Sequence, residues 1–104
     1  MLDLTESNFD ALVLQSAIPV LVDFWSPTCG PCRALVPVLG ALAAANEGDA
    51  LIAKVNVFDC PNLAKKYGVN MLPALLIFHN GNVAERMMGV QSQEKLQDAL
   101  DELL

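Results

Sequence analysis

The sequence predicts an α/β fold, and the chain supports this prediction in two places. Two compact apolar runs, at residues 19–25 and 50–57, enclose an apolar helical pattern, which is typical of a right-handed parallel crossover. Further along, residues 74–88 contain an Asn-Gly pair between two more strand-forming runs, which indicates an antiparallel hairpin. A sheet that combines these two connections is a mixed sheet.

The first elements are expected to be a small strand at residues 1–4 and a short helix. Residues 7–10 (Ser-Asn-Phe-Asp) have the form of a capping box, and apolar residues follow at helical spacing. The run at residues 19–25 is rich in strand formers, which is typical of a central strand covered on both faces. Asp23 is the anomaly in this run.

The middle of the chain is expected to continue with a helix, a strand and a shorter helix. Proline suits the first helical position, so the helix should begin at or near Pro31, and it should end near residues 46–48. The strand at residues 50–57 follows. Residues 61–67 can form a short helix, with Gly68 as its stop.

The last part of the chain is expected to form the hairpin and a final helix. Residues 79–82 (His-Asn-Gly-Asn) supply the turn between two antiparallel strands. Ser92 can cap a helix that follows the hairpin. The apolar stripe of this helix consists of Leu96, Ala99, Leu100, Leu103 and Leu104.

The composition bounds the organisation of the chain. With 104 residues, of which 54% are hydrophobic, the chain can bury one modest core and is too short for two ordinary domains. We therefore expect a single domain over residues 1–104. The longest apolar tract, residues 34–45, is interrupted by Pro37 and Gly40, whereas a membrane span needs about 20 apolar residues. No transmembrane helix and no membrane partner are expected.

The distribution of charge bears on nucleic-acid binding and on the location of the protein. The formal net charge is −6, and no basic cluster is larger than Lys65-Lys66, so nucleic acid is not expected as a partner. The first residues carry early acids and no basic segment before an apolar run, unlike a secretory signal. We therefore expect a cytoplasmic location. We also expect the protein to be a monomer.

Two of the three cysteines, Cys29 and Cys32, carry the main chemical signal. If the helix begins near Pro31, Cys29 lies just before it and faces unpaired backbone N–H groups, which favour a thiolate. Each unit of pKa depression corresponds to about 1.36 kcal/mol of preference for the charged form. Cys32 lies one turn inside the helix, nearer the core. The expected roles are attack by Cys29 on a foreign disulfide and release of the partner by Cys32. Gly30 and Pro31 fix the turn between them.

Two other uses of these sulfurs are possible. A permanent disulfide staple across so short a loop would stabilise the fold by only about 2 kcal/mol. A zinc site could use Cys29, Cys32, Cys60 and His79, but it lacks a second paired spacing, and His79 lies beside the hairpin turn. Three cysteines cannot all pair within one chain, which favours redox chemistry over a staple.

The chain resembles the thioredoxin family over nearly its full length, and the Cys-x-x-Cys spacing is itself best known from thioredoxin. The residues that carry the resemblance are Val22-Asp23-Phe24-Trp25, Cys29-Gly30-Pro31-Cys32, Lys54, Leu72-Pro73, Asn80-Gly81 and Gly89. It implies the thioredoxin fold, with a central mixed sheet of about five strands flanked by about four helices. The dithiol would lie at the carboxyl end of a middle strand.

The resemblance also implies the activity, which is the reduction of disulfides in client proteins. It implies no cofactor other than the redox-active pair of Cys29 and Cys32, which would be regenerated by a flavin-containing, NADPH-dependent thioredoxin reductase. Two alternatives stay open. One is an oxidant or isomerase with the same fold, and the other is a binding module in which the dithiol is dispensable.

Two charged residues match the family's proton-transfer machinery. Asp23 matches a buried carboxyl, and an acid inside an apolar strand should have a raised pKa and could exchange a proton with Cys32. The alternative is a carboxylate that turns to the surface at a strand edge. Lys54, on the neighbouring strand, either pairs with Asp23 and moderates its pKa or is a solvated lysine near the strand end.

A shallow groove for extended peptides is implied beside the dithiol. Pro73 matches the family's cis-proline, which presents backbone for a substrate strand. The residues expected to bind substrate are Trp25, Thr28, Met71, Leu72, Pro73 and Gly89. The chain departs from the family pattern around this groove, at Pro27, Thr28, Arg33, Met71 and Ala74. Thr28 stands where the family usually has tryptophan. These departures bear on which reductase and clients are recognised.

The third cysteine, Cys60, lies just past the second parallel strand, at the same end of the sheet as the dithiol. It is interpreted either as an inert, half-buried thiol or as a secondary site of oxidation or dimerisation. Only its exposure and thiolate character would make it reactive.

Overall fold

A five-stranded mixed sheet with strand order β1-β3-β2-β4-β5 forms the centre of the computed structural model, which describes residues 1–104. The elements are β1 (Leu2–Asp3), η1 (Asp10–Leu14), β2 (Val20–Trp25), α1 (Gly30–Ala45), β3 (Leu51–Asn56), α2 (Pro61–Lys66), β4 (Ala74–His79), β5 (Asn82–Met88) and α3 (Gln93–Asp101). The predicted α/β class and mixed sheet are confirmed.

The strand directions follow the connections expected from the sequence. Strands β1, β3 and β2 are parallel to one another, and β2–α1–β3 is the predicted crossover. Strand β4 runs antiparallel to both β2 and β5. The β4–β5 turn contains Asn80 at φ 54° and Gly81 at φ 81°, the left-handed conformations that a tight hairpin requires.

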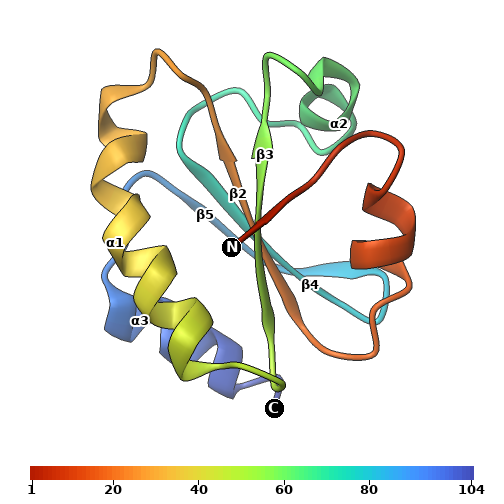
Figure 1. Ribbon diagram of the computed structural model, residues 1–104, viewed down its shortest axis with the longest axis vertical. Helices are drawn as coiled ribbons and strands as arrows, with labels where there is room; N and C mark the ends of the chain where they lie inside the picture. The colour runs from red at the N-terminus through yellow and green to blue at the C-terminus, as the bar shows by residue number, and fades with distance from the viewer.

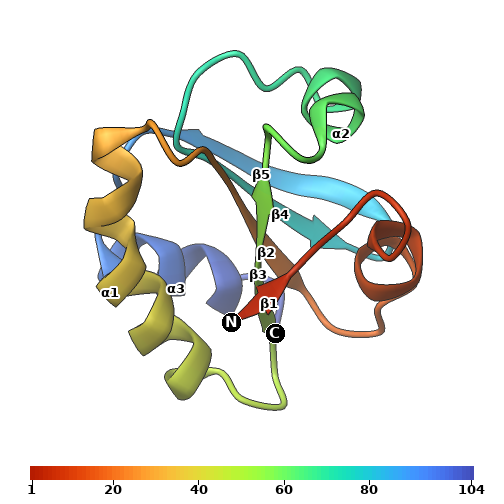
Figure 2. The ribbon, with the colours of Figure 1, turned by 45° about the horizontal axis from the view of Figure 1, so that its top comes forward.

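Helices cover both faces of the sheet (Figure 1). The helices α1 and α3 lie on one face, and η1 and α2 lie on the other, an arrangement that persists in the turned view of Figure 2. Side chains alternate along β2, so Val22 and Phe24 point into the core under η1 and α2, whereas Leu21 points toward α1 and α3. Asp23 therefore faces α1 from the middle of the sheet.

The far end of α1 is fastened to α3. Asn46, the C-cap of α1, is buried, and its side-chain amide donates to Gln97 Oε1 at 2.7 Å. Gln97 Nε2 donates back to Asn46 Oδ1 at 2.8 Å. This reciprocal amide pair joins the two helices at the end opposite the cysteines.

The helix starts confirm two predictions and correct a third. Cys29 is the N-cap of α1, and Ser92 caps α3 by accepting from Lys95 N at 3.1 Å. The short first helix is present, but it is a π-helix without a side-chain cap. The reciprocal bonds of a capping box join Thr5 and Asn8 instead, because the turn at residues 6–8 brings these two residues together. Thr5 N donates to Asn8 Oδ1, and Asn8 N donates to Thr5 Oγ1.

No helix here is both long enough and apolar enough to traverse a lipid bilayer.

Candidate active site

The two cysteines at the start of α1 are joined by a disulfide, with their Cα atoms 5.4 Å apart. Cys29 has an extended backbone at φ −88° and ψ 104°, so it lies just outside the helix as its N-cap. Its Sγ accepts a hydrogen bond from Cys32 N at 3.2 Å. An acceptor in this position satisfies one of the free N–H groups of the first turn. The same geometry would stabilise negative charge on this sulfur after reduction.

The two sulfurs differ in their access to solvent. Cys32 is 5% exposed, whereas Cys29 is only partly buried and is flanked by the exposed residues Thr28 and Gly30. A disulfide partner from another protein can therefore approach Cys29 and not Cys32. The difference matches the division of roles expected from the sequence.

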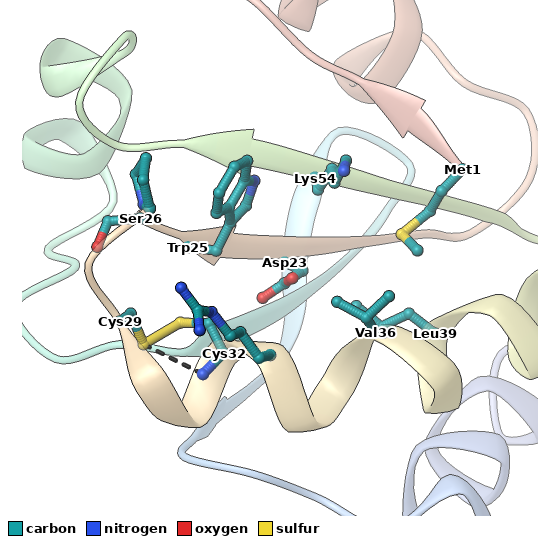
Figure 3. A pocket seen from close by; sticks show the side chains of 11 residues that line it. Met1, Asp23, Trp25, Ser26, Cys29, Cys32, Val36, Leu39 and Lys54 are labelled. Carbon is teal, nitrogen blue, oxygen red and sulfur yellow. Dashed lines mark hydrogen bonds between the residues drawn. A yellow bond between two sulfur atoms is a disulfide. The ribbon is translucent and has the colours of Figure 1, made fainter.

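The carboxyl group of Asp23 is buried beneath α1, 4% exposed, and its Oδ1 has no hydrogen-bond partner. Burial raises the pKa of Asp23 to about 7. The positive charge of Lys54 acts in the opposite direction, but its effect is smaller. The sequence prediction of a buried acid with a raised pKa is confirmed, and the alternative of a surface carboxylate is wrong. Figure 3 shows the carboxyl between Cys32 and Val36.

Lys54 lies beside Asp23 in the sheet but pairs with a different acid. The two residues are register partners between β2 and β3. However, Lys54 Nζ lies 3.6 Å from Asp3 Oδ1 and 5.3 Å from the centre of the Trp25 ring. The direct ion pair with Asp23 that the sequence suggested is therefore absent, because β1 supplies a more accessible carboxylate. Lys54 is one-third exposed, so it is not simply a solvated lysine either.

A small cavity of about 130 Å³ lies between α1 and the sheet at the dithiol. It brings together five residues predicted for the site, namely Asp23, Trp25, Cys29, Cys32 and Lys54. The other lining residues are Met1, Ser26, Pro27, Arg33, Val36 and Leu39. The indole Nε1 of Trp25 is buried without a hydrogen-bond partner. The cavity therefore contains two unpaired polar atoms, one on Trp25 and one on Asp23.

The segment around Pro73 lies at the same end of the sheet as the dithiol. The Leu72–Pro73 bond is cis, as the resemblance implies. Ala74 pairs with Phe24, so Pro73 lies level with the end of β2, where the chain leaves toward Cys29. Gly89, at φ 80°, donates its N–H to the carbonyl of Pro73 at 2.8 Å. Pro73 and Gly89 are thereby held together.

The remaining predicted binding residues lie apart from this cavity. Met71 is 58% exposed, and it lines a separate groove with Leu72 beside α2. Thr28 is exposed, and its hydroxyl lies 3.3 Å from the buried hydroxyl of Ser26. The structure thus gathers Asp23, Cys29 and Cys32 in one cavity, whereas Thr28 and Met71 are exposed outside it and Leu72 is half-buried against the core.

The alternative zinc site is not formed, since no three side chains of His, Cys, Asp or Glu lie close enough to hold a metal ion. His79 lies at the hairpin end of β4, away from the dithiol, and Cys60 is buried elsewhere. Cys60 is 3% exposed, and its thiol points to the carbonyl of Leu4 at 3.8 Å. Burial raises the pKa of Cys60, and the negative charges of Glu6 and Asp59 raise it further.

Five residues of the site were missed at the level of sequence. Asp3 pairs with Lys54, and Met1, Ser26, Val36 and Leu39 line the cavity. Val36 follows Cys32 by one helical turn, so helical periodicity could have placed it beside Cys32. The pairing of Asp3 depends on the β1–β3 register, and a two-residue strand carries too little pattern to predict it.

A half-buried sulfur that can become a thiolate and a sheltered partner sulfur three residues later are the groups that thiol–disulfide exchange requires. By class, the protein is therefore a thiol–disulfide oxidoreductase. The model of the family described as Thioredoxin matches residues 1–102. The chain belongs to the thioredoxin family, and its thioredoxin fold is the one expected from the sequence.

The relatives span bacterial and plant proteins. The chain is 43% identical to "Thioredoxin" of Chlorobaculum thiosulfatiphilum over 94% of its own length and 91% of that protein. It is 40% identical to "Thioredoxin 1" of Nostoc sp. over 96% of its own length and 94% of that protein. It is also 43% identical to "Thioredoxin M5, chloroplastic" of Oryza sativa subsp. japonica over 92% of its own length, but it spans only 56% of that protein.

Proposed function

We propose that the protein acts as a reductant of disulfides in client proteins, with Cys29 as the attacking sulfur and Cys32 as the resolving sulfur. The observation that carries this proposal is the N-cap position of Cys29, whose Sγ accepts from Cys32 N while Cys32 is buried. Disulfide-containing substrates and a reductase are general to the family. The particular substrates and reductase of this chain are part of the proposal.

The proposed reaction moves two electrons from the dithiol to the client. The Cys29 thiolate attacks one sulfur of the client disulfide, so that a mixed disulfide forms and the other client sulfur leaves as a thiolate. Cys32 then loses its proton and attacks Cys29 Sγ. The mixed disulfide breaks, the second client sulfur leaves, and the Cys29–Cys32 disulfide is restored. That last state is the one the structure contains.

Asp23 is proposed as the group that exchanges the proton of Cys32. It lies on the strand beneath α1 and lines the same cavity as Cys32. A carboxyl with a pKa of about 7 can both accept and donate a proton near neutral pH, which an ordinary aspartate cannot do well. Lys54 is proposed to moderate that pKa, since its positive charge lowers it against the larger effect of burial.

The client is proposed to bind as an extended segment along the surface around Pro73. Gly89 holds the Pro73 carbonyl, Thr28 is exposed next to Cys29, and the exposed Met71 lies two residues before Pro73. Trp25 and Leu72 would complete the surface from either side. Gly30 and Pro31 would shape the turn that presents Cys29.

We further propose that the chain works in the cytoplasm as a monomer, with an NADPH-dependent thioredoxin reductase as its electron donor and no cofactor besides its own disulfide. The acidic composition, with a net charge of −6, supports protein clients over nucleic acid. Fractionation of the source cell and gel filtration would test the location and the oligomeric state.

The test of this function is NADPH-dependent reduction of insulin in the presence of a thioredoxin reductase. We expect turnover by the wild type and none by the double variant Cys29→Ser, Cys32→Ser. Equilibration with glutathione separates a reductant from an oxidant. A potential near the value typical of thioredoxins, about −270 mV, supports the reductant, and a value near −120 mV would make the protein an oxidant. Full biological complementation by the double variant would instead indicate a binding module.

A further inference from the structure

Three charged residues stand in one row across the parallel part of the sheet. Asp3 of β1 is the register partner of Lys54 of β3, and Lys54 is in turn the register partner of Asp23 of β2. Register partners on neighbouring strands project from the same face of a sheet. Lys54 is thus placed between two carboxyl groups, one on each neighbouring strand.

The single ammonium group is not shared equally by the two acids. Lys54 Nζ lies 3.6 Å from Asp3 Oδ1, whereas no ion pair joins it to Asp23, and Asp23 Oδ1 has no hydrogen-bond partner. The Trp25 ring, 5.3 Å from Nζ, gives the ammonium a second favourable contact. Figure 3 shows Lys54 above β2 and the Asp23 carboxyl below it, toward α1.

We propose that Asp3 is a positioning residue that holds the Lys54 ammonium away from Asp23. The inference rests on the proposed role of Asp23 in proton exchange. An ammonium drawn to Asp23 would stabilise its charged form, and the carboxyl would then be a poor proton donor near neutral pH. On this proposal Asp3 limits the influence of Lys54 on Asp23, so that the effect of burial on the pKa exceeds that of Lys54.

The other charged groups near this row differ in where they act. Arg33 of α1 and Met1, which carries an amino group, line the cavity with Asp23. Glu6 and Asp59 line a second hollow, which contains Asp3 and Lys54 but not Asp23. On the other side, β4 and β5 present the uncharged Leu75 and Met87 in the same row as Asp23. Asp3 is the acid in direct contact with Lys54.

The experiment follows the Asp23 carboxyl directly, by its ¹³C chemical shift against pH in the oxidised protein, where Cys29 and Cys32 do not titrate. We expect Asp3→Asn to lower the midpoint by about half a pH unit, the size expected if the released Lys54 ammonium moves from roughly 8 Å to roughly 5 Å from the carboxylate at an effective dielectric constant of about 40. Asp3 is 77% exposed on its side chain, so the variant should fold, and circular dichroism checks this.

Two controls separate positioning from a plain charge effect. Asp49→Asn removes the same charge from an exposed turn with no ion pair, and it should leave the midpoint unchanged. In a Lys54→Met background, Asp3→Asn should lose most of its effect, because no ammonium remains to be released. An unchanged midpoint in Asp3→Asn, an equal shift in Asp49→Asn, or an undiminished shift without Lys54 would each overturn the proposal.

The pH dependence of insulin reduction gives the second readout. We expect Asp3→Asn to move the turnover profile in the same direction as the carboxyl midpoint. A shifted midpoint with an unshifted profile would leave the positioning role of Asp3 intact and would refute the proton-exchange role of Asp23 instead.

Discussion

Two helices of this protein begin with a cysteine as N-cap and a proline in the first turn, yet the two sulfurs have opposite environments. Cys29 turns its Sγ toward the helix, where it accepts from Cys32 N. Cys60 makes no such contact at the start of α2, and its thiol points to the Leu4 carbonyl in the core. The position of a cysteine at a helix start is therefore not enough to make it reactive, since the direction of the side chain decides which charge it meets.

The two sulfurs also differ in the acidic side chains near them. Glu6 and Asp59 add negative charge around Cys60 and, with burial, raise the pKa of its thiol. Beside the dithiol, the acid is Asp23, whose pKa burial raises to about 7. The acids around Cys60 thus add negative charge that keeps its thiol neutral, whereas the acid beside the dithiol is itself neutral below about pH 7.

The largest effect expected from this comparison is on turnover. Cys29→Ser should reduce insulin reduction by roughly 1000-fold or more, because a hydroxyl at this position cannot form the mixed disulfide. Cys60→Ser should leave the rate within about twofold once folding is verified, since Cys60 is buried and bonded to backbone. Full reductive turnover by Cys29→Ser would show that the nucleophile is wrongly assigned.

The second effect is on stability against pH. The pKa of Asp23 is raised in the folded state to about 7 from an unfolded value of 3.8, so the folded protein holds the proton more tightly. This contribution is fully present below pH 4 and is lost as the pH rises through 7. The free energy of unfolding should fall by roughly 4 kcal/mol, which is about three powers of ten in the folding equilibrium constant.

Urea unfolding of the oxidised protein at pH 4 and pH 8 measures this contribution. Asp23→Asn should remove the drop that the wild type shows, whereas Asp59→Asn, the exposed acid next to Cys60, should retain it. Equal drops in the wild type and in Asp23→Asn would mean that Asp23 titrates normally in the folded protein.

The third effect is on alkylation of the reduced protein. At pH 7, iodoacetamide should modify Cys29 at least about 10-fold faster than Cys60, because the N–H groups at the start of α1 favour the Cys29 thiolate, whereas burial and the charges of Glu6 and Asp59 raise the pKa of Cys60. Peptide mapping by mass spectrometry after short exposures distinguishes the two sites. Equal rates would remove the electrostatic basis for assigning Cys29 as the nucleophile.

Most of the fold could be predicted because its elements carry strong periodic signals. The apolar run of β2, the proline at the start of α1 and the Asn80-Gly81 turn each specify a local geometry that the rest of the fold does not oppose. The capping box at residues 7–10 was misplaced by a few positions. Several acceptors stand close together there, and only the tertiary path of the chain selects Thr5 and Asn8.

The site was predictable to the extent that its chemistry depends on local sequence. The positions of Cys29 and Cys32 follow from the helix start, and the burial of Asp23 follows from its apolar strand. The partner of Lys54 did not follow, because Asp3 and Asp23 are both its neighbours across strands and sequence does not weigh one against the other. Lys54 contacts Asp3 because the Asp3 carboxylate is exposed to water and stays charged, whereas the Asp23 carboxyl is buried.

The reciprocal amide pair of Asn46 and Gln97 has a consequence for how the fold responds to reduction of the disulfide. Helix α1 is bonded to α3 at its C-terminal end, so reduction or formation of the Cys29–Cys32 disulfide at its N-terminal end need not shift the whole helix. Changes would then be confined to the first turn of α1, and the rest of the fold would keep its shape. A fixed frame of this kind would let one dithiol meet protein disulfides of different shapes without a rearrangement of the whole fold.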